Sequence, residues 1–244
     1  MAGHSKWANI RHRKGKADAA KGKVFSRIAK EIISAVKVGG SSDPKMNPRL
    51  RVALQKAREA NVPNEIVDRN IKKGASADQA AYDEVTYELY GYGGVGIIVE
   101  GLTDNRNRFS SDMRIAINKK GGTIASPGAV AFNFDRKGIL QISTKNAIQD
   151  ELFNAAIDAG AEEFETEDET YIITTEPASL YAVKESIEKL GFKCEQADLE
   201  LIPKSYVECP LEAAKDNLAL IEWLENLDDV DSVYHNMKIP DELI

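Results

Sequence analysis

Residues 138–202 read GILQISTKNAIQDELFNAAIDAGAEEFETEDETYIITTEPASLYAVKESIEKLGFKCEQADLELI, and this stretch decides the fold class. Its β-rich runs lie at residues 138–143, 162–166, 171–175 and 194–202. Between the runs, two apolar stripes at helical period end at Gly160 and Gly191. The order strand, helix, strand, strand, helix, strand predicts one complete ferredoxin-like βαββαβ domain.

The same pattern flanks this stretch, but it is cut in half. Further β-rich runs lie at residues 85–90, 95–101, 130–135, 205–209 and 230–235, and helical stripes lie at 109–117 and 211–224. The simplest interpretation is a second α+β domain, built from residues 76–136 plus 203–244, into which the domain of residues 137–202 is inserted.

The first 75 residues have a helical pattern instead. Apolar residues recur at helical spacing within residues 18–38, and Asn47 and Pro48 have the residue types that begin a helix. A third, shorter stripe ends at Gly74. The predicted fold is therefore α+β: an N-terminal three-helix bundle, residues 1–75, followed by two small ferredoxin-like domains, one inserted into the other.

Charge is divided unequally along the chain. Residues 1–75 contain 18 Lys or Arg against 6 Asp or Glu, a net charge of +12, whereas residues 76–244 contain 14 against 33, a net charge of −19. Such an asymmetry indicates nucleic-acid or membrane contact, and two ordinary solvated faces are the alternative. Phosphate would repel the acidic part and leave the basic part as the docking end.

The basic part opens with GHSKWANIRHRKGK, residues 3–16, which has five Lys or Arg and no carboxylate. A cationic arm of this kind gains affinity by releasing counterions from nucleic-acid phosphates. Trp7 and the histidines add flat surfaces that stack on unpaired bases. Trp7 alternatively anchors the arm to the bundle by packing.

The predicted nucleic-acid contacts are the arm and the cations that face outward from the bundle, together with two arginines further along. They are Lys6, Trp7, Arg11, His12, Arg13, Lys14, Lys16, Lys21, Lys23, Arg49, Arg51, Lys56, Arg58, Arg69, Lys72, Lys73, Arg106 and Arg108. The helical pattern also places Arg27 and Lys30 on the outside of the bundle.

Arg106 and Arg108 belong to the segment TDNRNR, residues 103–108, at a predicted strand-to-helix junction. Free backbone N–H groups and the positive end of the helix favour an anion there, and the two guanidinium groups add charge-assisted donors. The alternative is a capped helix with solvated arginines, since Asn and Asp commonly begin helices.

A glycine motif, an acidic run and the histidines each resemble a ligand site, but their spacing or surroundings do not fit one. GYGGVG, residues 91–96, has the spacing of a dinucleotide fingerprint, yet a strand follows it, so a hairpin turn is favoured. The acidic run of residues 162–170 lacks the spacing of a calcium loop. Two of the three histidines lie in the basic arm, where a metal would meet like charge.

The sequence also limits the class of protein. It has no nucleophile motif, no membrane-length apolar run and no metal-like cysteine spacing, so we expect a cytoplasmic non-enzyme without a cofactor, metal or membrane contact. The alternative from another class is an enzyme, or a module for a regulatory metabolite, that uses the cleft between the two α+β domains.

Several motifs resemble one protein family. GHSKWANIRHRK at the start, NPRLR at residues 47–51, YELYGYGGVG, TDNRNR, KKGG at residues 119–122 and VYHN at residues 233–236 are similar to those of the YebC/PmpR proteins. Relatives of that family include the mitochondrial translational activator of cytochrome oxidase subunit I. The sequence departs from the family's glycine motif at Leu89 and Tyr92, where a small residue and a proline are expected.

The resemblance implies a helical N-terminal domain, two nested α+β domains and a DNA-binding role in transcription regulation. It also leaves open a ribosome- or rRNA-binding translation factor that assists synthesis of difficult segments such as proline runs. A helix-turn-helix in the bundle would place Glu65 and Asp68 at the start of its reading helix, where DNA phosphates would repel their carboxylates. A basic arm with a tryptophan suits RNA equally well.

Overall fold

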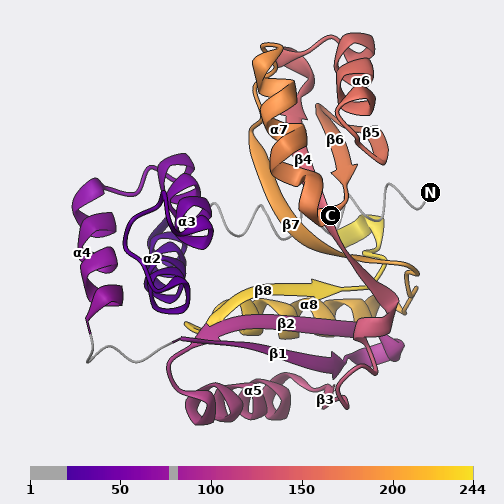
Figure 1. The fold of residues 1–244 in the computed structure, drawn as a ribbon. Coiled ribbons are helices and arrows are strands. Elements are labelled where there is room, and N and C mark those ends of the chain that lie inside the picture. Colours follow the sequence, from indigo (N-terminus) through magenta and orange to yellow (C-terminus); the bar gives the residue numbers. More distant parts are fainter. Residues whose placement is uncertain (1–20, 77–81, 244) are drawn as a thin grey trace. The chain divides into compact units, whose positions relative to one another are not determined.

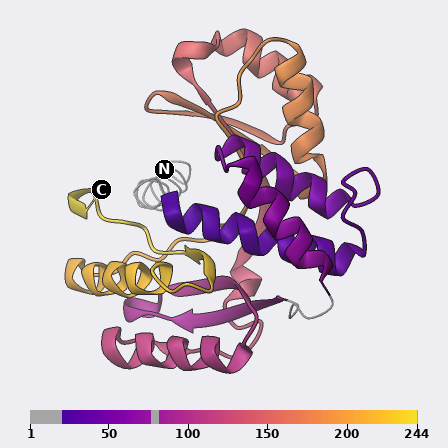
Figure 2. The same cartoon turned by 90° about the vertical axis from the view of Figure 1, so that its left-hand side faces the viewer.

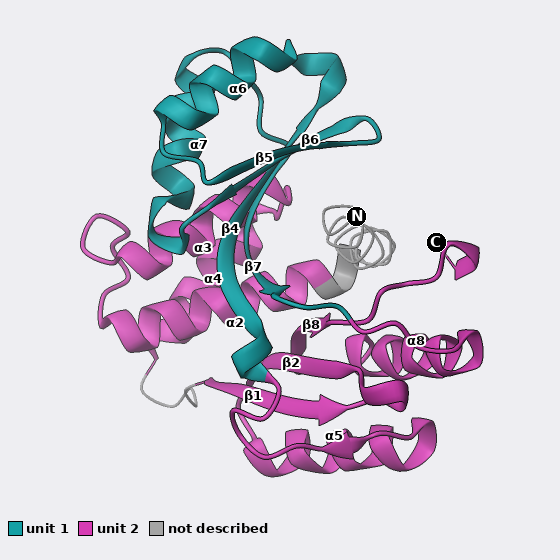
Figure 3. Ribbon diagram, turned by 90° about the vertical axis from the view of Figure 1, so that its right-hand side faces the viewer, with its two compact units in different colours: residues 1–10, 131–206 teal, residues 11–130, 207–244 magenta. Residues whose placement is uncertain are grey.

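The computed structural model describes residues 21–76 and 82–243, with side chains from residue 24 onward. The chain divides into two compact units (Figure 3). Of the described residues, one unit comprises 21–76, 82–130 and 207–243, and the other comprises 131–206. The predicted arm, residues 3–16, lies outside the described residues.

Three helices form the bundle of the first unit, drawn from indigo to purple in Figure 2. They are α2 (Lys21–Gly39), α3 (Pro48–Glu59) and α4 (Asn64–Ala75). Asn47 caps α3 as predicted, because its Oδ1 accepts a hydrogen bond from the Leu50 backbone N–H at 3.1 Å. The shared apolar face includes the fully buried Ile32 and Leu50, each of which contributes roughly 1.5–3 kcal/mol by burial.

A four-stranded antiparallel sheet completes the first unit (Figure 1). Its strands are β1 (Asp83–Tyr90), β2 (Gly96–Thr103), β3 (Thr123–Ile124) and β8 (Val230–His235), in the order β3-β1-β2-β8. The helices α5 (Arg106–Lys120) and α8 (Leu211–Glu225) pack on one face of this sheet, where Phe109, Met113 and Leu220 join the strand residues in a common core.

The second unit is the predicted βαββαβ domain. Its elements are β4 (Phe134–Ser143), α6 (Gln149–Asp158), β5 (Glu163–Glu167), β6 (Thr170–Thr175), α7 (Leu180–Lys189) and β7 (Gln196–Pro203). The strand order β5-β6-β4-β7, antiparallel throughout, is the ferredoxin-like arrangement. Apolar residues of α6 and α7, including Leu152 and Val183, pack on one face of the sheet.

Short 3₁₀ turns occupy several connections in both units. They are Tyr92–Gly94, Ala131–Asn133, Thr144–Asn146, Pro177–Ser179 and Asp241–Leu243.

The predictions for three strands were wrong in detail. Residues 131–133 of the run at 130–135 form a 3₁₀ turn, and the end of that run joins the run at 138–143 in one strand, β4, because Gly138 continues the extended chain where a side chain would collide with Thr175 and Leu180. The run at residues 205–209 forms a single bridge, between Val207 and Met237, because Pro210 turns the chain into α8. The sequence pattern missed the two-residue strand β3.

The predicted fold class is confirmed. Helices precede two small antiparallel sheets, and the chain of the second sheet lies in sequence between β3 and β8 of the first. The domain boundaries at residues 75, 136 and 202 stay predictions.

Candidate nucleic-acid interface

Two of the predicted contacts on α3, Arg49 and Lys56, form ion pairs, and the other two, Arg51 and Arg58, form none within the described residues. Arg49 lies 3.8 Å from Glu84 in an exposed ion pair, and Lys56 donates hydrogen bonds of 3.1 and 3.3 Å to the Glu31 carboxylate. Arg51 is exposed and donates from Nε to the Pro44 carbonyl at 3.3 Å. Arg58 is exposed and forms no ion pair within the described residues. The ion pair of Arg49 is exposed and contributes little energy, so a phosphate can replace it, whereas Glu31, the partner of Lys56, is only 20% exposed.

The cations of α4 lie together at its C-terminal end. Arg69, Lys72 and Lys73 are exposed, and none of them forms an ion pair with another described residue. Because residues three and four apart in a helix are neighbours, Lys72 and Lys73 lie one turn from Arg69. Glu65 and Asp68, which are also exposed, lie toward the N-terminal end of α4. The C-terminal half of α4 is therefore the end that suits phosphate.

The predicted contacts in the arm lie outside the described residues. They are Lys6, Trp7, Arg11, His12, Arg13, Lys14 and Lys16, and the side chains of Lys21 and Lys23 are outside the description too. Their roles stay predictions.

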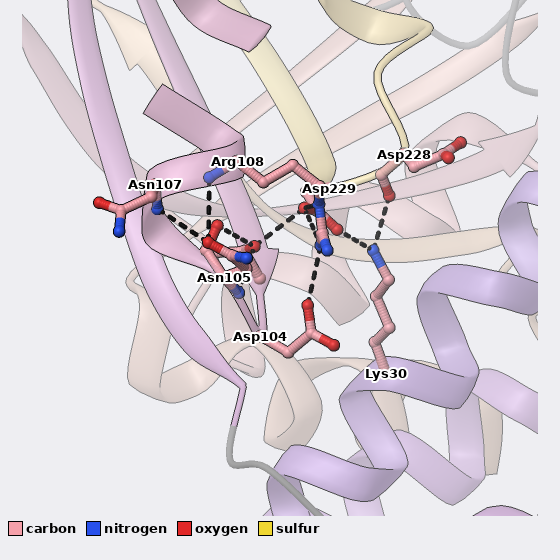
Figure 4. Close-up of polar contacts among 8 residues, drawn as sticks. Lys30, Asp104, Asn105, Asn107, Arg108, Asp228 and Asp229 are labelled. Atoms are coloured by element: carbon pink, nitrogen blue, oxygen red, sulfur yellow. Dashed lines mark hydrogen bonds and ion pairs between the residues drawn. The ribbon is translucent and has the colours of Figure 1, made fainter. Parts of the chain in front are cut away.

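The segment TDNRNR begins α5 as predicted, and its polar groups already have partners within the chain. Asn105 caps the helix, and its Oδ1 accepts hydrogen bonds from the backbone N–H groups of Asn107 at 3.1 Å and Arg108 at 3.0 Å (Figure 4). Arg106 donates from Nε to Asp83 at 2.7 Å. The structure therefore has the capped helix, and an anion there would have to displace these bonds.

Arg108 has the stronger partners. It donates to Asp229 from Nε at 3.1 Å and from Nη2 at 2.5 Å, and Nη2 also bonds to Asp104 at 2.8 Å. These hydrogen bonds raise the pKa of Arg108 above its ordinary value. Nucleic-acid contact through Arg106 and Arg108 stays a prediction, since both guanidinium groups bond to carboxylates of the chain.

Asp229 is the centre of this network (Figure 4). It is 4% exposed, and besides Arg108 it accepts hydrogen bonds from Lys30 Nζ at 2.7 Å and Thr103 Oγ1 at 2.9 Å. Burial alone would raise the pKa of Asp229, but the hydrogen bonds from Lys30, Arg108 and Thr103 outweigh it and lower the pKa. The carboxylate therefore stays charged and links α2 to the sheet.

The interpretation of Lys30 as an outward cation was wrong. Its ammonium group bonds to Asp229 and to the Asp228 carbonyl, both at 2.7 Å, and its side chain is 14% exposed. Arg27 similarly lies 3.4 Å from Glu31 and 3.7 Å from Asp231. Helical periodicity locates the polar face of α2, but it does not show that acids of β8 and of the turn before it lie against that face.

The glycine turn of residues 91–96 is a hairpin connection, as predicted. It joins the antiparallel strands β1 and β2, and Gly93 and Gly94 have φ of 69° and 79°. The buried Asn217 of α8 fixes the turn, since its Oδ1 accepts from the Tyr92 N–H at 2.7 Å and its Nδ2 donates to the Tyr92 carbonyl at 3.0 Å. Sequence reasoning did not find this role of Asn217.

Within residues 21–76 and 82–243, no group of three His, Cys, Asp or Glu side chains is placed to hold a metal ion. None of the helices in these ranges is long and apolar enough to cross a membrane.

The fold and the site together define a class of protein: a helical head with exposed cations, followed by two small α+β domains, one within the other. Two family models match the chain in the same order. The TACO1/YebC N-terminal domain matches residues 5–77, and the TACO1/YebC second and third domains match residues 82–237. The chain belongs to the TACO1/YebC family.

Individual relatives match over almost the whole chain. A protein of Protochlamydia amoebophila named "Probable transcriptional regulatory protein pc1328" is 73% identical over 100% of this chain and 99% of its own. One of Chlamydia muridarum, named "Probable transcriptional regulatory protein", is 55% identical over 97% of this chain and 100% of its own. The crystal structure of the conserved hypothetical protein Aq1575 from Aquifex aeolicus has a TM-score of 0.85 at 42% identity and covers 98% of each chain.

Proposed function

We propose that this protein is a non-enzymatic regulator of gene expression that binds duplex DNA through its basic N-terminal part. The names of the relatives describe transcriptional regulators, and they favour this role over the ribosomal alternative. The observation that carries the proposal is the set of exposed cations on the bundle that form no ion pair within the described residues, namely Arg58, Arg69, Lys72 and Lys73.

The distribution of charge supports the same docking end. Residues 131–206 contain 7 Lys or Arg against 16 Asp or Glu, a net charge of −9, so phosphate repels this unit. The bundle carries its free cations on α3 and at the C-terminal end of α4. Contacts of this kind fix a protein on the nucleic-acid backbone without reading its sequence.

Salt dependence tests the proposal directly. Fluorescence anisotropy of the full chain with a labelled 30-base-pair DNA duplex, measured over a range of NaCl concentrations, gives the slope of log affinity against log salt. We expect Arg69→Ala, Lys72→Ala and Lys73→Ala together to flatten the slope by about 2 to 3 units. The triple variant Arg11→Ala, Arg13→Ala and Lys14→Ala should do the same if the arm also contacts phosphate.

A matched control removes the same charge from the other unit. Lys145→Ala, Lys189→Ala and Lys193→Ala change three exposed lysines of the unit of residues 131–206 and should leave the slope unchanged. If the control flattens the salt slope as much as the α4 variant does, the change reflects net charge alone and not contact through α4. If the α4 variant leaves the slope unchanged, α4 does not contact phosphate. The same titration with a duplex RNA identifies a ribosomal role if RNA binds more tightly than DNA.

A further inference from the structure

Helix α5 has an exposed face of unusual composition. Its inner side carries Phe109, Met113 and Ala116, which are at most 1% exposed. On the opposite side, the exposed residues follow the spacing i, i+4, i+7 and i+11, so they form one line along the helix. They are Asn107, Ser111, Arg114 and Asn118. The ribbon views place α5 at an outer edge of its unit (Figures 1 and 2).

The chemistry of this line is not that of an ordinary solvated helix face. Asn and Ser are weaker helix formers than the Glu, Lys or Ala usual at exposed positions, and each costs several tenths of a kcal/mol of helix stability. The line contains no carboxylate, and its amide, hydroxyl and guanidinium groups are those that hydrogen-bond to base edges. No side chain in the line has a hydrogen-bond partner within the described residues. Ile115, 44% exposed beside it, offers an apolar contact for a thymine methyl.

The charge of α5 suits a polyanion. The helix carries five Lys or Arg against one Asp, although its domain is acidic. At its C-terminal end, the ammonium groups of Lys119 and Lys120 lie 5.1 and 5.6 Å from the centre of the Trp223 ring of α8, so Arg114 is the cation of the exposed line itself.

The acids around α5 limit how a ligand can approach. Asp83 and Asp104 bond to the two arginines of its first turn. The neighbouring helix α8 exposes Glu212, Asp216 and Glu222. A nucleic-acid backbone must therefore approach α5 from the side away from α8, where Arg114 is exposed, whereas Lys119 and Lys120 lie against Trp223 of α8.

We propose that the outer face of α5 reads base edges in the major groove of B-form DNA, with Arg114 and Asn118 as the reading residues. This inference rests on the proposed function: the bundle and arm hold the phosphates, and α5 adds selectivity for sequence. The 15-residue helix is roughly 22 Å long, enough to lie along a major groove. Duplex RNA does not fit, because its major groove is too narrow for side chains to read.

The bundle offers a rival reading helix, and its charges argue against it. Helix α4 exposes Glu65 and Asp68 in its first half, where a reading helix usually contacts bases. In the line on α5, no residue is acidic. We therefore assign contact with the DNA phosphates to α4 and contact with the base edges to α5.

In vitro selection with the full chain tests the proposal. A library of DNA duplexes with a 16-base-pair random region is selected with the wild type, with Arg114→Ala/Asn118→Ala, and with Arg58→Ala as a control. Arg58→Ala removes an exposed arginine from the bundle, so the charge change of Arg114→Ala is matched. All three proteins should melt at the same temperature, because the altered side chains are exposed.

We expect the wild type to enrich a sequence motif. In anisotropy titrations, we compare the affinity for the enriched duplex with that for a scrambled one. The ratio of the two should be smaller in the α5 variant than in the wild type by a factor of about 5 to 150. Binding of the α5 variant to the scrambled duplex should weaken by no more than in the control. Arg58→Ala should weaken binding to both duplexes equally and leave the ratio unchanged.

Three results would overturn the inference. If the wild type binds duplexes but enriches no motif, α5 reads no sequence although the proposed function stands. If the α5 variant enriches the same motif with the same ratio, another element reads the bases. If the wild type binds no DNA duplex at all, the proposed function fails and takes this inference with it.

Discussion

Asp231 offers a sharp test of the electrostatics at strand β8. The β2–β8 register passes from Glu100 opposite Ser232 to Gly101 opposite Val230, so Asp231 is the extra residue of a bulge. Its side chain is 21% exposed and lies 3.7 Å from the Arg27 guanidinium. Burial raises the pKa of Asp231 from 3.8 to about 6, in spite of nearby Arg27, Lys30 and Lys56, and Glu31 adds to the rise.

The free energy follows from the shift. A pKa of about 6 in the folded protein and about 3.8 in the unfolded chain differ by about two units, which corresponds to about 3 kcal/mol. Between these values the folded state binds more protons than the unfolded state, so stability falls as pH rises. The contribution of the protonated carboxyl is fully present below about pH 4 and is lost through pH 6.

The variant Asp231→Asn removes the titration and keeps the side-chain shape. Relative to the wild type, its free energy of unfolding should rise by up to about 1.4 kcal/mol per pH unit between about pH 4 and 6, then level off about 3 kcal/mol higher. The attraction of Arg27 for the ionised carboxylate is already part of the Asp231 pKa and so of the pH-dependent difference, whereas any change in packing from the new amide adds an offset that does not vary with pH. The pH-dependent part of the difference therefore isolates Asp231.

Urea unfolding at a series of pH values measures this difference. In a Trp7→Phe background, the fluorescence of Trp223 on α8 reports the unfolding of the sheet that contains β8. Ser232→Ala changes a neighbouring buried side chain without removing a titratable group, so its difference from the wild type should not vary with pH. A flat difference for Asp231→Asn, or one that falls with pH, would refute the assigned burial.

Two further predictions concern the glycine turn between β1 and β2. Asn217→Ala should lower the free energy of unfolding by about 1–3 kcal/mol, because it leaves the Tyr92 N–H and carbonyl without their partner; a change below 0.5 kcal/mol in urea unfolding would contradict this. Gly121→Ala should cost at least about 1–3 kcal/mol, since φ is 86° and the new methyl group would collide with Tyr92. Gly40→Ala, at φ 64° with open space, is its control and should lose less in thermal unfolding.

Local patterns predicted most of the fold because the physics that sets the elements is local. The cap at Asn47, the stop at Gly121 and the alternation of the β-rich runs each depend on a few neighbouring residues. The pattern failed where tertiary packing decides. Gly138 looked like a break between two strands, but it lies within β4 because Thr175 and Leu180 leave no room for a side chain.

The candidate interface was less predictable for the same reason. Charge and periodicity identify which residues are polar, but they do not show which acids meet them. Lys30 and Asp229 are 199 residues apart, and Arg108 and Asp229 are 121 apart. In the sequence this network appeared as two separate segments, TDNRNR at residues 103–108 and the two adjacent acids at residues 228 and 229, with nothing to join either of them to Lys30.

These partners change what the net charge of the N-terminal part means. The +12 of residues 1–75 suggests many phosphate contacts, yet within the bundle Arg27, Lys30 and Lys56 already face Glu31, Asp229 or Asp231. A cation held by a buried carboxylate releases no counterion from DNA unless that bond breaks, and breaking it leaves an uncompensated buried charge. The slope of log affinity against log salt should therefore reflect the cations of α3 and α4 that lack ion pairs, together with those of the arm that contact phosphate. The number of phosphate contacts that it gives should be smaller than the formal net charge of residues 1–75.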